Sequence, residues 1–231
     1  MMLIYKLSIR LFAILIRLLS PFHRKAALLR KGRKETLEKI ADAFPDSNIL
    51  VAWFHCASLG EFEQGRPLIE AFKTHFPRYK ILLTFFSPSG YEIRKNYPLA
   101  DCVAYLPSDT MLNAQNFISI ARPKVAFFIK YEFWHYYFRC LKAHNIPIFS
   151  VSAIFRPQQL FFKSYGTFFR ITLHCVSHFF VQNQRSKDLL ASIGLQNTTL
   201  TGDTRFDRVK AIFDAKKSIP IAEQFKNNSP T

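Results

Sequence analysis

Two glutamates stand at points in the sequence where a carboxylate could act as an acid or a base. Glu61 follows an apolar run, 49–54, after a short turn of small residues, and a helix-period pattern starts at it. Glu132 follows a second apolar run, 125–129, and lies close to the cation Lys130. A carboxylate at the junction of a strand and a helix can take a proton from a hydroxyl, or it can simply stabilise the positive end of the helix. The local pattern leaves both roles open for Glu61, and Glu132 could equally be half of a structural ion pair.

Small residues in two predicted turns offer groups that could hold a substrate. Ser58 and Gly60 belong to the turn that follows the first apolar run, and Ser87-Pro-Ser89-Gly90 forms a second turn that opens another helix-period pattern. Backbone N–H groups at such a turn can hold an anion. An N-cap serine followed by proline at the first helical position explains the same four residues, and the local sequence favours that explanation.

A third group of side chains combines aromatic rings with cations. The pairs Phe161-Phe162 and Phe168-Phe169 lie close in sequence to Arg156 and to two further cations. Paired phenylalanines at such spacing are more often part of a core than of a binding face. Beside the cations, however, they could receive an acyl chain and a phosphate together, with Arg156 as a phosphate ligand.

Several other kinds of chemistry are not indicated. The four cysteines are far apart and have no metal-ligand spacing, which is typical of reduced, buried thiols in a cytosolic protein, so we predict no metal site. Neither a GxGxxG nor a P-loop motif occurs, and the histidines show no nucleophile–base arrangement, so we expect them to be packing or surface groups. The formal net charge of +16 requires an anionic partner, but no nucleic-acid-binding motif accompanies it.

The elements that must position these residues alternate regularly. From residue 49 onward, short apolar runs are separated by helical periods, and this alternation favours βαβ units and a Rossmann-like, doubly wound parallel sheet. The predicted strands are 49–54, 80–85, 102–105, 125–129, 146–151, 179–182 and 198–201, and the predicted helices are 61–76, 88–96, 110–121, 133–144, 158–174, 186–193 and 209–217. If the strand order is the common 3-2-1-4-5-6, Glu61 and Glu132 face one crevice at the point where the order reverses.

The N-terminal segment predicts attachment to a membrane surface. Residues 1–34 contain nine lysines and arginines and no acidic residue. In an apolar helix over 2–22, Lys6, Arg10 and Arg17 fall within roughly 40° of one another. Each central charge costs roughly 3 kcal/mol in a bilayer, whereas each apolar side chain returns roughly 0.5 kcal/mol. The sum favours a helix that lies in the interface over one that spans the bilayer. An ordinary packed helix is the remaining alternative.

Five motifs in order give the sequence a family resemblance. They are Trp53-Phe-His-Cys-Ala-Ser-Leu-Gly-Glu61, Thr84-Phe-Phe-Ser-Pro-Ser-Gly90, Tyr105-Leu-Pro-Ser-Asp109, Glu132-Phe-Trp134 and Gly202-Asp-Thr-Arg-Phe-Asp207. They resemble the W-x-H-x-A-S-x-G-E, T-x-x-[ST]-P-[ST]-G, Y-x-P-x-D, E-x-E-x-W-P and G-N-x-K-F-D motifs of the 3-deoxy-D-manno-octulosonic acid (Kdo) transferases that act on lipid A precursors. The sequence departs from the fourth motif, since Lys130 replaces its first glutamate and His135 its proline.

The resemblance implies an enzyme of lipopolysaccharide biosynthesis. Such an enzyme is a GT-B glycosyltransferase on the cytoplasmic face of the plasma (inner) membrane, and it moves Kdo from CMP-Kdo to the lipid A precursor lipid IVA with inversion and without a cofactor. By the resemblance, Glu61 is the general base. Glu132 positions the acceptor or supports the base, while Ser58, Gly60, Ser87, Ser89, Gly90 and Arg156 bind or support the substrate.

We predict three segments on this basis: 1–34 as a basic, membrane-associating helix and basic segment, 35–207 as a Rossmann-like acceptor-binding domain, and 208–231 as an interdomain linker. The C-terminal domain that would hold CMP-Kdo is expected to be absent, so the chain alone should be inactive. The alternative is a non-catalytic domain that binds lipid A precursor or acidic membrane. The number of Kdo units transferred, the acyl preference and the oligomeric state stay open.

Overall fold

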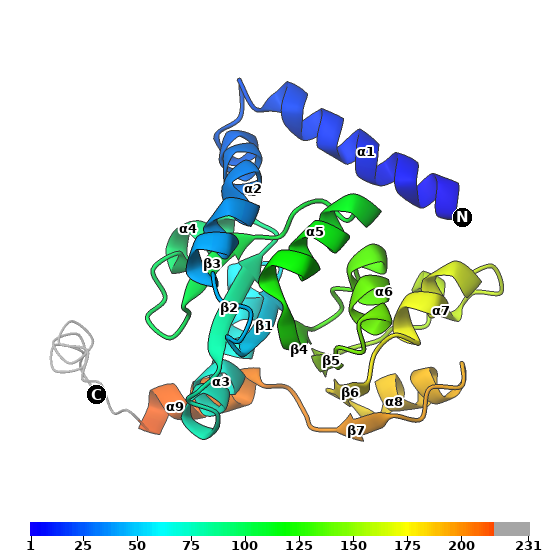
Figure 1. Ribbon diagram of the computed structural model, residues 1–231. Helices are drawn as coiled ribbons and strands as arrows, with labels where there is room; N and C mark the ends of the chain where they lie inside the picture. The colour runs from blue at the N-terminus through cyan, green and yellow to red at the C-terminus, as the bar shows by residue number, and fades with distance from the viewer. Residues whose placement is uncertain (215–231) are drawn as a thin grey trace, which may run out of the picture.

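A single parallel sheet of seven strands forms the centre of the computed structural model, which describes residues 1–214 (Figure 1). The order β3-β2-β1-β4-β5-β6-β7 confirms the predicted doubly wound topology, with its reversal between β1 and β4. The strands are β1 (Val51–Cys56), β2 (Lys80–Phe85), β3 (Cys102–Tyr105), β4 (Pro123–Ile129), β5 (Ile148–Ala153), β6 (His178–Val181) and β7 (Thr198–Leu200).

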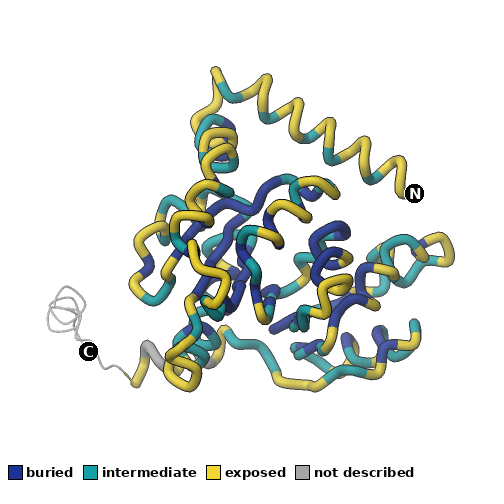
Figure 2. Tube along the Cα trace, in the orientation of Figure 1, coloured by how far each residue is buried: buried dark blue, intermediate teal, exposed yellow. Residues whose placement is uncertain are grey.

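Strands β1 and β2 read as nearly continuous apolar runs because both of their faces are covered. Every residue of β1 is buried, and its side chains alternate between two cores. Trp53 belongs to the core that α2, α5, α6, α7 and α8 cover, whereas Phe54 belongs to the core under α3. Figure 2 shows the strands as the most buried part of the fold. The ends of β1 and β4, from which both candidate glutamates extend, are therefore held rigidly.

The helices match the predicted pattern with two differences. They are α1 (Met2–Leu19), α2 (Arg24–Ala43), α3 (Leu59–His75), α4 (Pro88–Arg94), α5 (Met111–Ala121), α6 (His135–Ala143), α7 (Thr167–Leu173), α8 (Gln184–Ala191) and α9 (Arg205–Asp214). The end of the helix predicted over 209–217 and most of the linker predicted over 208–231 lie outside the described residues. Helix α2 was not predicted. Its buried residues Ala26, Leu29, Thr36 and Ile40 recur every three to seven positions, but the dense basic charge on its other faces dominates the sequence pattern.

The continuous helix predicted over 158–174 is wrong. The segment forms a short 3₁₀ helix, η1 (Leu160–Phe162), and then α7, with a turn between them. Gly166 lies in this turn so close to the carbonyl group of Leu160 that a Cβ atom would overlap it. The chain therefore folds back on itself at Gly166, and the repeated phenylalanines that imitate a helix period belong to two separate elements.

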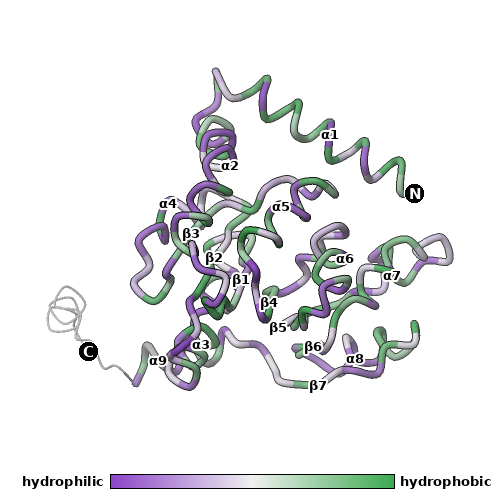
Figure 3. The backbone as a smooth tube through the Cα atoms, in the orientation of Figure 1, coloured by the Kyte–Doolittle hydropathy of each residue, from purple (hydrophilic) through white to green (hydrophobic). Residues whose placement is uncertain are grey.

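Helix α1 lies along one side of the fold with one narrow stripe turned inward (Figure 1). The stripe consists of Tyr5, Ile9, Phe12 and Ile16, which are half-buried, and no residue of the helix is fully buried. Its other faces alternate strongly between apolar and basic residues (Figure 3), and Leu3, Leu7, Leu11 and Leu18 are each more than 60% exposed. Within residues 1–214, no helix is long and apolar enough to cross a membrane. The interfacial position stays a prediction.

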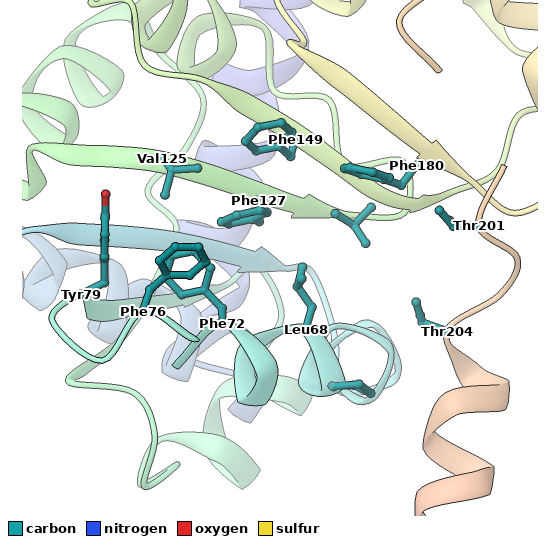
Figure 4. Close-up of a pocket in the computed structure, with 12 residues that line it drawn as sticks. Leu68, Phe72, Phe76, Tyr79, Val125, Phe127, Phe149, Phe180, Thr201 and Thr204 are labelled. Atoms are coloured by element: carbon teal, nitrogen blue, oxygen red, sulfur yellow. The ribbon is translucent and has the colours of Figure 1, made fainter. Parts of the chain in front are cut away.

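One half of the sheet is bare on the face that carries α3. An apolar groove of about 660 Å³ runs along β4, β5 and β6 there, between Phe72 of α3 and Thr204 before α9 (Figure 4). Phe127, Phe149 and Phe180 form its floor. The groove lies on the face of the sheet opposite the core that Tyr5 of α1 packs against.

Candidate active site

The Glu61 carboxylate sits at the N-terminus of α3, where the chain leaves the buried strand β1. Its Oε2 atom accepts a hydrogen bond of 2.6 Å from the backbone N–H of Ala57. Ser58 is the N-cap residue, but its hydroxyl group makes no capping hydrogen bond, and the glutamate instead reaches back to the residue before the cap. The whole residue is only 6% exposed. The hydrogen bond from Ala57 therefore explains the orientation of Glu61 but not its burial.

The electrostatic surroundings of Glu61 differ from those of a simple dipole partner. Burial, and after it the negative charge of Glu132, raise the pKa of Glu61 from 4.5 to about 7, against the lowering effects of the Ala57 N–H and of Lys130. A glutamate that only stabilised a helix end would have a lowered pKa. At neutral pH this carboxyl group is therefore poised to exchange a proton.

Glu132 follows β4, in the loop next to the one that carries Glu61 in the sheet order, and its charge acts on Glu61. The structure thus brings the two predicted glutamates to neighbouring strand ends, at the point where the strand order reverses. Within residues 1–214, Glu132 has no ion pair with Lys130; its recorded partner is the ring of His55, 3.9 Å from Oε2. Lys130 adopts a left-handed backbone conformation, with φ of 65°, which turns the chain sharply after β4.

A network of hydrogen-bonded side chains, all buried except the partly exposed Trp134, supports the loop that carries Glu132. Trp134 Nε1 donates to His55 Nε2 at 3.2 Å, and His55 Nδ1 lies 2.9 Å from the hydroxyl oxygen of Thr84. Trp53 Nε1 donates to the same hydroxyl at 2.8 Å. Since Nε2 accepts from Trp134, the proton of His55 is on Nδ1. Every polar side-chain atom of this hydrogen-bonded network then has a partner. The contact between His55 and Glu132 is accordingly not an ion pair. His55 is a packing group, as predicted, but it also fixes the loop of Glu132.

The second predicted turn, 87–90, caps helix α4 and is also hydrogen-bonded to the first turn, which follows β1. Ser87 caps α4, its hydroxyl accepting from the Ser89 N–H at 3.2 Å, with Pro88 at the first helical position. The Ser87 N–H donates to the carbonyl oxygen of Ala57 at 2.8 Å, which ties this turn to the residue that binds Glu61. Gly90 is buried at the same contact, because a Cβ atom there would overlap the Phe85 ring. This geometry favours the capping interpretation over a separate anion site.

Arg156 belongs to a third loop, the one that follows β5. Its side chain is exposed, and its backbone N–H donates to Gln159 Oε1 at 2.9 Å. The adjoining aromatic residues line a pocket of about 370 Å³ that includes Tyr131 and Phe133, on either side of Glu132, together with Phe161 and Phe169. An aromatic cavity thus opens beside the candidate site, on the same side of the sheet as Tyr5 of α1.

One polar group near the site was not anticipated from the sequence. Gln64, one turn after Glu61, is 1% exposed, and its Nε2 donates to Asp203 Oδ1 at 3.2 Å while its Oε1 has no partner in the part of the chain described. This bond links α3 to the fifth motif, 139 residues later, and nothing in the local sequence around Gln64 signals it. Among residues 1–214, no cluster of three or more histidine, cysteine, aspartate or glutamate side chains could hold a metal ion.

Comparison with known proteins gives a consistent result. A family model described as 3-Deoxy-D-manno-octulosonic-acid transferase (kdotransferase) matches residues 23–208. The 3-deoxy-D-manno-octulosonic acid transferase of Rickettsia bellii is 25% identical over 226 residues, which cover 94% of this chain and 54% of that protein. The protein of the same name from Aquifex aeolicus is 34% identical over 83 residues, 36% of this chain and 23% of that one. The chain therefore spans about half the length of the Rickettsia bellii relative, and its match to the Aquifex aeolicus protein covers a smaller share of that protein.

Among solved structures, a UDP-N-acetylglucosamine 2-epimerase from Rickettsia bellii superposes with a TM-score of 0.57 at 13% identity, over 78% of this chain and 52% of that one. The UDP-GlcNAc 2-epimerase of Methanocaldococcus jannaschii gives 0.56 at 15% identity, over 79% and 53%. At these identities the likeness is one of fold alone: a Rossmann-like α/β domain.

Proposed function

The chain belongs to the 3-deoxy-D-manno-octulosonic acid transferase family as its N-terminal domain, and from this premise we propose that it is the acceptor-binding half of a Kdo transferase. In this proposal the enzyme moves Kdo from CMP-Kdo to the glucosamine 6′-hydroxyl of the lipid A precursor lipid IVA. CMP-Kdo is held mainly by a second domain outside this chain, and no cofactor takes part.

The observation that carries the proposal is the state of Glu61. Its carboxyl group is buried, its pKa is raised to about 7, and it is fixed by a hydrogen bond from the Ala57 N–H at the mouth of the sheet. A group with a pKa near the working pH, held in one orientation, meets the two requirements of a general base. The position of Glu61 in the first of the five motifs supports the same role.

In the proposed step, the acceptor hydroxyl oxygen forms a bond to the anomeric carbon of Kdo while its proton passes to Glu61. The bond between that carbon and the phosphate oxygen breaks on the opposite face, and its electron pair leaves with CMP. One displacement inverts the anomeric carbon, so no covalent intermediate with the protein is needed. Glu132 contributes by keeping the Glu61 proton affinity high, and Lys130 by limiting that rise.

The residues around Glu61 leave room for the acceptor. Gly60 is exposed, and a Cβ atom there would meet nothing closer than the Ser58 hydroxyl at 4.0 Å. Packing within the domain therefore does not require a glycine at this position, whereas close approach of a sugar would. Ser58 offers a free hydroxyl at the same helix end, and the capped turn of Ser87, Ser89 and Gly90 supports it from behind.

The lipid part of the acceptor is proposed to lie toward α1. The aromatic pocket beside Glu132 is suited to an acyl chain, and the exposed Arg156 near its edge to a phosphate. The apolar and basic faces of α1 would hold the domain on the cytoplasmic face of the inner membrane, where such an acceptor is embedded.

The test is a transfer assay with CMP-Kdo and lipid A precursor, on a fusion of this chain to the second half of the Rickettsia bellii relative. We expect Kdo-lipid A from the fusion, a loss of about a thousandfold for Glu61→Gln, and full activity for Glu38→Gln, an exposed carboxylate of α2. Normal turnover by Glu61→Gln would remove Glu61 from the mechanism. The chain without its fusion partner should give no product; measurable transfer by it would contradict a donor site outside the chain.

A further inference from the structure

A small pocket between α1 and α5 has the composition of an anion site. It measures about 240 Å³ and is lined by Lys6, Ile9 and Arg10 of α1, by residues 109–112 at the start of α5, and by Tyr136 of α6. Both cations are exposed, and within residues 1–214 neither has an ion pair with a carboxylate. Two exposed cations without a carboxylate partner in the described residues thus line this concave surface.

The N-terminus of α5 contributes further donors to the same pocket. The first backbone N–H groups of a helix have no acceptor within the helix, and they carry the positive end of its dipole. The hydroxyl group of Thr110, the N-cap residue, accepts from only one of them, that of Asn113, at 3.2 Å. The first two residues of the helix, Met111 and Leu112, also line the pocket.

An independent observation at this place is the hydroxyl group of Tyr136. The residue is 3% exposed, yet its hydroxyl has no hydrogen-bond partner in the described part of the chain. A buried hydroxyl without a partner is costly, and each one in a folded protein calls for an explanation. This hydroxyl belongs to a residue that lines the pocket. Burial and the charge of Asp109 raise the pKa of Tyr136, and the charges of Arg139 and Arg10 oppose that rise.

The one carboxylate in the pocket wall, Asp109, is buried, and its oxygens are engaged by donors from other elements. Asp109 accepts hydrogen bonds from the Tyr5 hydroxyl and from the backbone N–H groups of Tyr136 and Tyr137, the last at 3.1 Å. Burial raises the pKa of Asp109, against the lowering effect of these hydrogen bonds. Asp109 acts as the brace that joins α1, α5 and α6 around the pocket.

We propose that this pocket binds the phosphate group of an anionic membrane lipid, with Arg10 and Lys6 as charge partners and the Tyr136 hydroxyl as a specific donor. The inference rests on the membrane association included in the proposed function. Arg10 and Lys6 are on the flank of α1 between its inward stripe and its exposed leucines. If those leucines enter the bilayer, the flank lies at the depth of the lipid head groups.

The experiment compares two kinds of vesicle that have the same surface charge. Both are made of phosphatidylcholine, one doped with phosphatidic acid and the other with a fatty acid, and the doping is matched by zeta potential. Binding of the 231-residue chain is measured by sedimentation. We expect tighter binding to the phosphatidic acid vesicles. Equal binding of the unaltered chain to both would overturn the proposal, since surface charge alone would then account for attachment.

Three variants separate the pocket from general electrostatics. Tyr136→Phe should abolish the preference for phosphatidic acid while leaving binding to fatty acid vesicles unchanged, since no charge is lost. Arg10→Gln should lose the preference and also weaken both bindings about fivefold. Arg17→Gln, which removes a cation from the same flank two turns away, should weaken both about fivefold and keep the preference. A preference that survives in Tyr136→Phe, or that is lost equally in Arg17→Gln, would contradict the site.

Two further measurements complete the design. Thermal melting of Tyr136→Phe checks that the fold is kept, and Arg10→Gln alters an exposed side chain in any case. Glycerol 3-phosphate is added as a soluble probe; if it binds the chain as tightly as the vesicles do, the ligand is a free phosphate and the assignment to a lipid is wrong. No sugar donor is present, so failure here leaves Kdo transfer untouched, and failure of Kdo transfer would leave this binding assay unaffected.

Discussion

At the scale of single residues, the Glu61 carboxylate experiences opposing effects. The Ala57 N–H and Lys130 favour its ionised form, whereas burial and the nearby Glu132 favour its protonated form. The second pair is stronger, so the folded domain holds a proton that an exposed glutamate would already have released. This arrangement suits proton transfer, but it should cost the domain stability at neutral pH.

The pH dependence of stability tests this cost. Between pH 4.5 and 7 the folded state binds more protons at Glu61 than the unfolded state does, so this residue lowers the free energy of unfolding as the pH rises. We expect Glu61→Gln, which keeps an acceptor for the Ala57 N–H, to be more stable than the unaltered chain by up to about 3 kcal/mol above pH 7. Below pH 4.5 the two should be alike.

Urea unfolding across this pH range provides the measurement, and Glu38→Gln serves as the control because its carboxylate is exposed on α2. The control should follow the unaltered chain at every pH. A Glu61→Gln variant that is less stable at pH 8 would mean that the ionised carboxylate stabilises the helix end after all.

Lys130 offers a second test at this scale, because its charge lowers the pKa of Glu61. Lys130→Met should raise that pKa above about 7, and a ¹³C NMR titration of labelled glutamate carboxyl groups would measure it. Lys124→Met removes a cation from the opposite end of the same strand and should leave the Glu61 titration unchanged. Identical titrations in both variants would show that Lys130 does not act on Glu61.

The sequence allowed both glutamates to be named, because each follows a recognisable strand. The pKa of Glu61 could not be predicted, since burial of its carboxyl group depends on how α3 packs against the sheet. The link from Gln64 to Asp203 was equally hidden, because the two residues meet only through the tertiary fold. Local sequence identifies which groups could react, whereas packing decides their proton affinities.

At the scale of elements, two glycines in the first turns of α3 and α4 can be contrasted. Gly90 is needed for the contact of α4 with Phe85, and a Cβ atom there would also come within 3.1 Å of the Leu59 backbone nitrogen. Gly60 meets no such obstacle. One glycine thus serves the fold, whereas the other leaves space in front of the helix end.

Alanine substitutions should separate these two roles. Gly90→Ala should lower the free energy of unfolding by about 1–3 kcal/mol, as overpacking does. Gly60→Ala should leave stability unchanged or raise it by about 0.5 kcal/mol, since alanine suits a helix better, but it should impair Kdo transfer by the fusion enzyme. Urea unfolding and the transfer assay measure the two effects; a Gly60→Ala variant with full activity would argue against close approach of the acceptor.

Strands were easier to predict than helices, for a physical reason. A parallel strand covered on both faces, such as β1, is a short apolar run that stands out by composition alone. Helices α2 and α7 were misjudged because charge hid the buried face of α2 and because Gly166 breaks a phenylalanine-rich period. In both cases the deciding contact joins residues from separate elements.

At the scale of the whole molecule, α1 is attached by its inner stripe while its outer leucines have no partner in the described structure. Leu11→Glu places a charge on that outer stripe and should weaken vesicle binding at least about tenfold, because a charged side chain must then enter the apolar layer. Ile93→Glu, on α4, alters an equally exposed apolar side chain and should bind as the unaltered chain does. Sedimentation with acidic vesicles measures both, and equal binding by the two variants would contradict attachment through α1.

Removing the N-terminal segment is a poorer test of vesicle attachment through α1 than the sequence suggests. Removing residues 1–34 would cut through α2 and take away Ala26 and Leu29, which are buried in the described fold. The predicted boundary was placed by charge, whereas the packing of α2 on the sheet extends across it. Substitutions on the outer face of α1 leave that packing intact.

The two tryptophans of the chain are both held by the same hydrogen-bonded network, through Thr84 and His55. Trp53 is fully buried, but Trp134 is partly exposed and stacks on Phe86 at the edge of the crevice. The intrinsic fluorescence of this protein is therefore a reporter of its crevice, with no label required. Titration with lipid A precursor should shift the emission of the unaltered chain and leave that of Trp134→Phe constant. Binding beside Trp134 would thus be detected as a shift of the tryptophan emission wavelength before any product is formed.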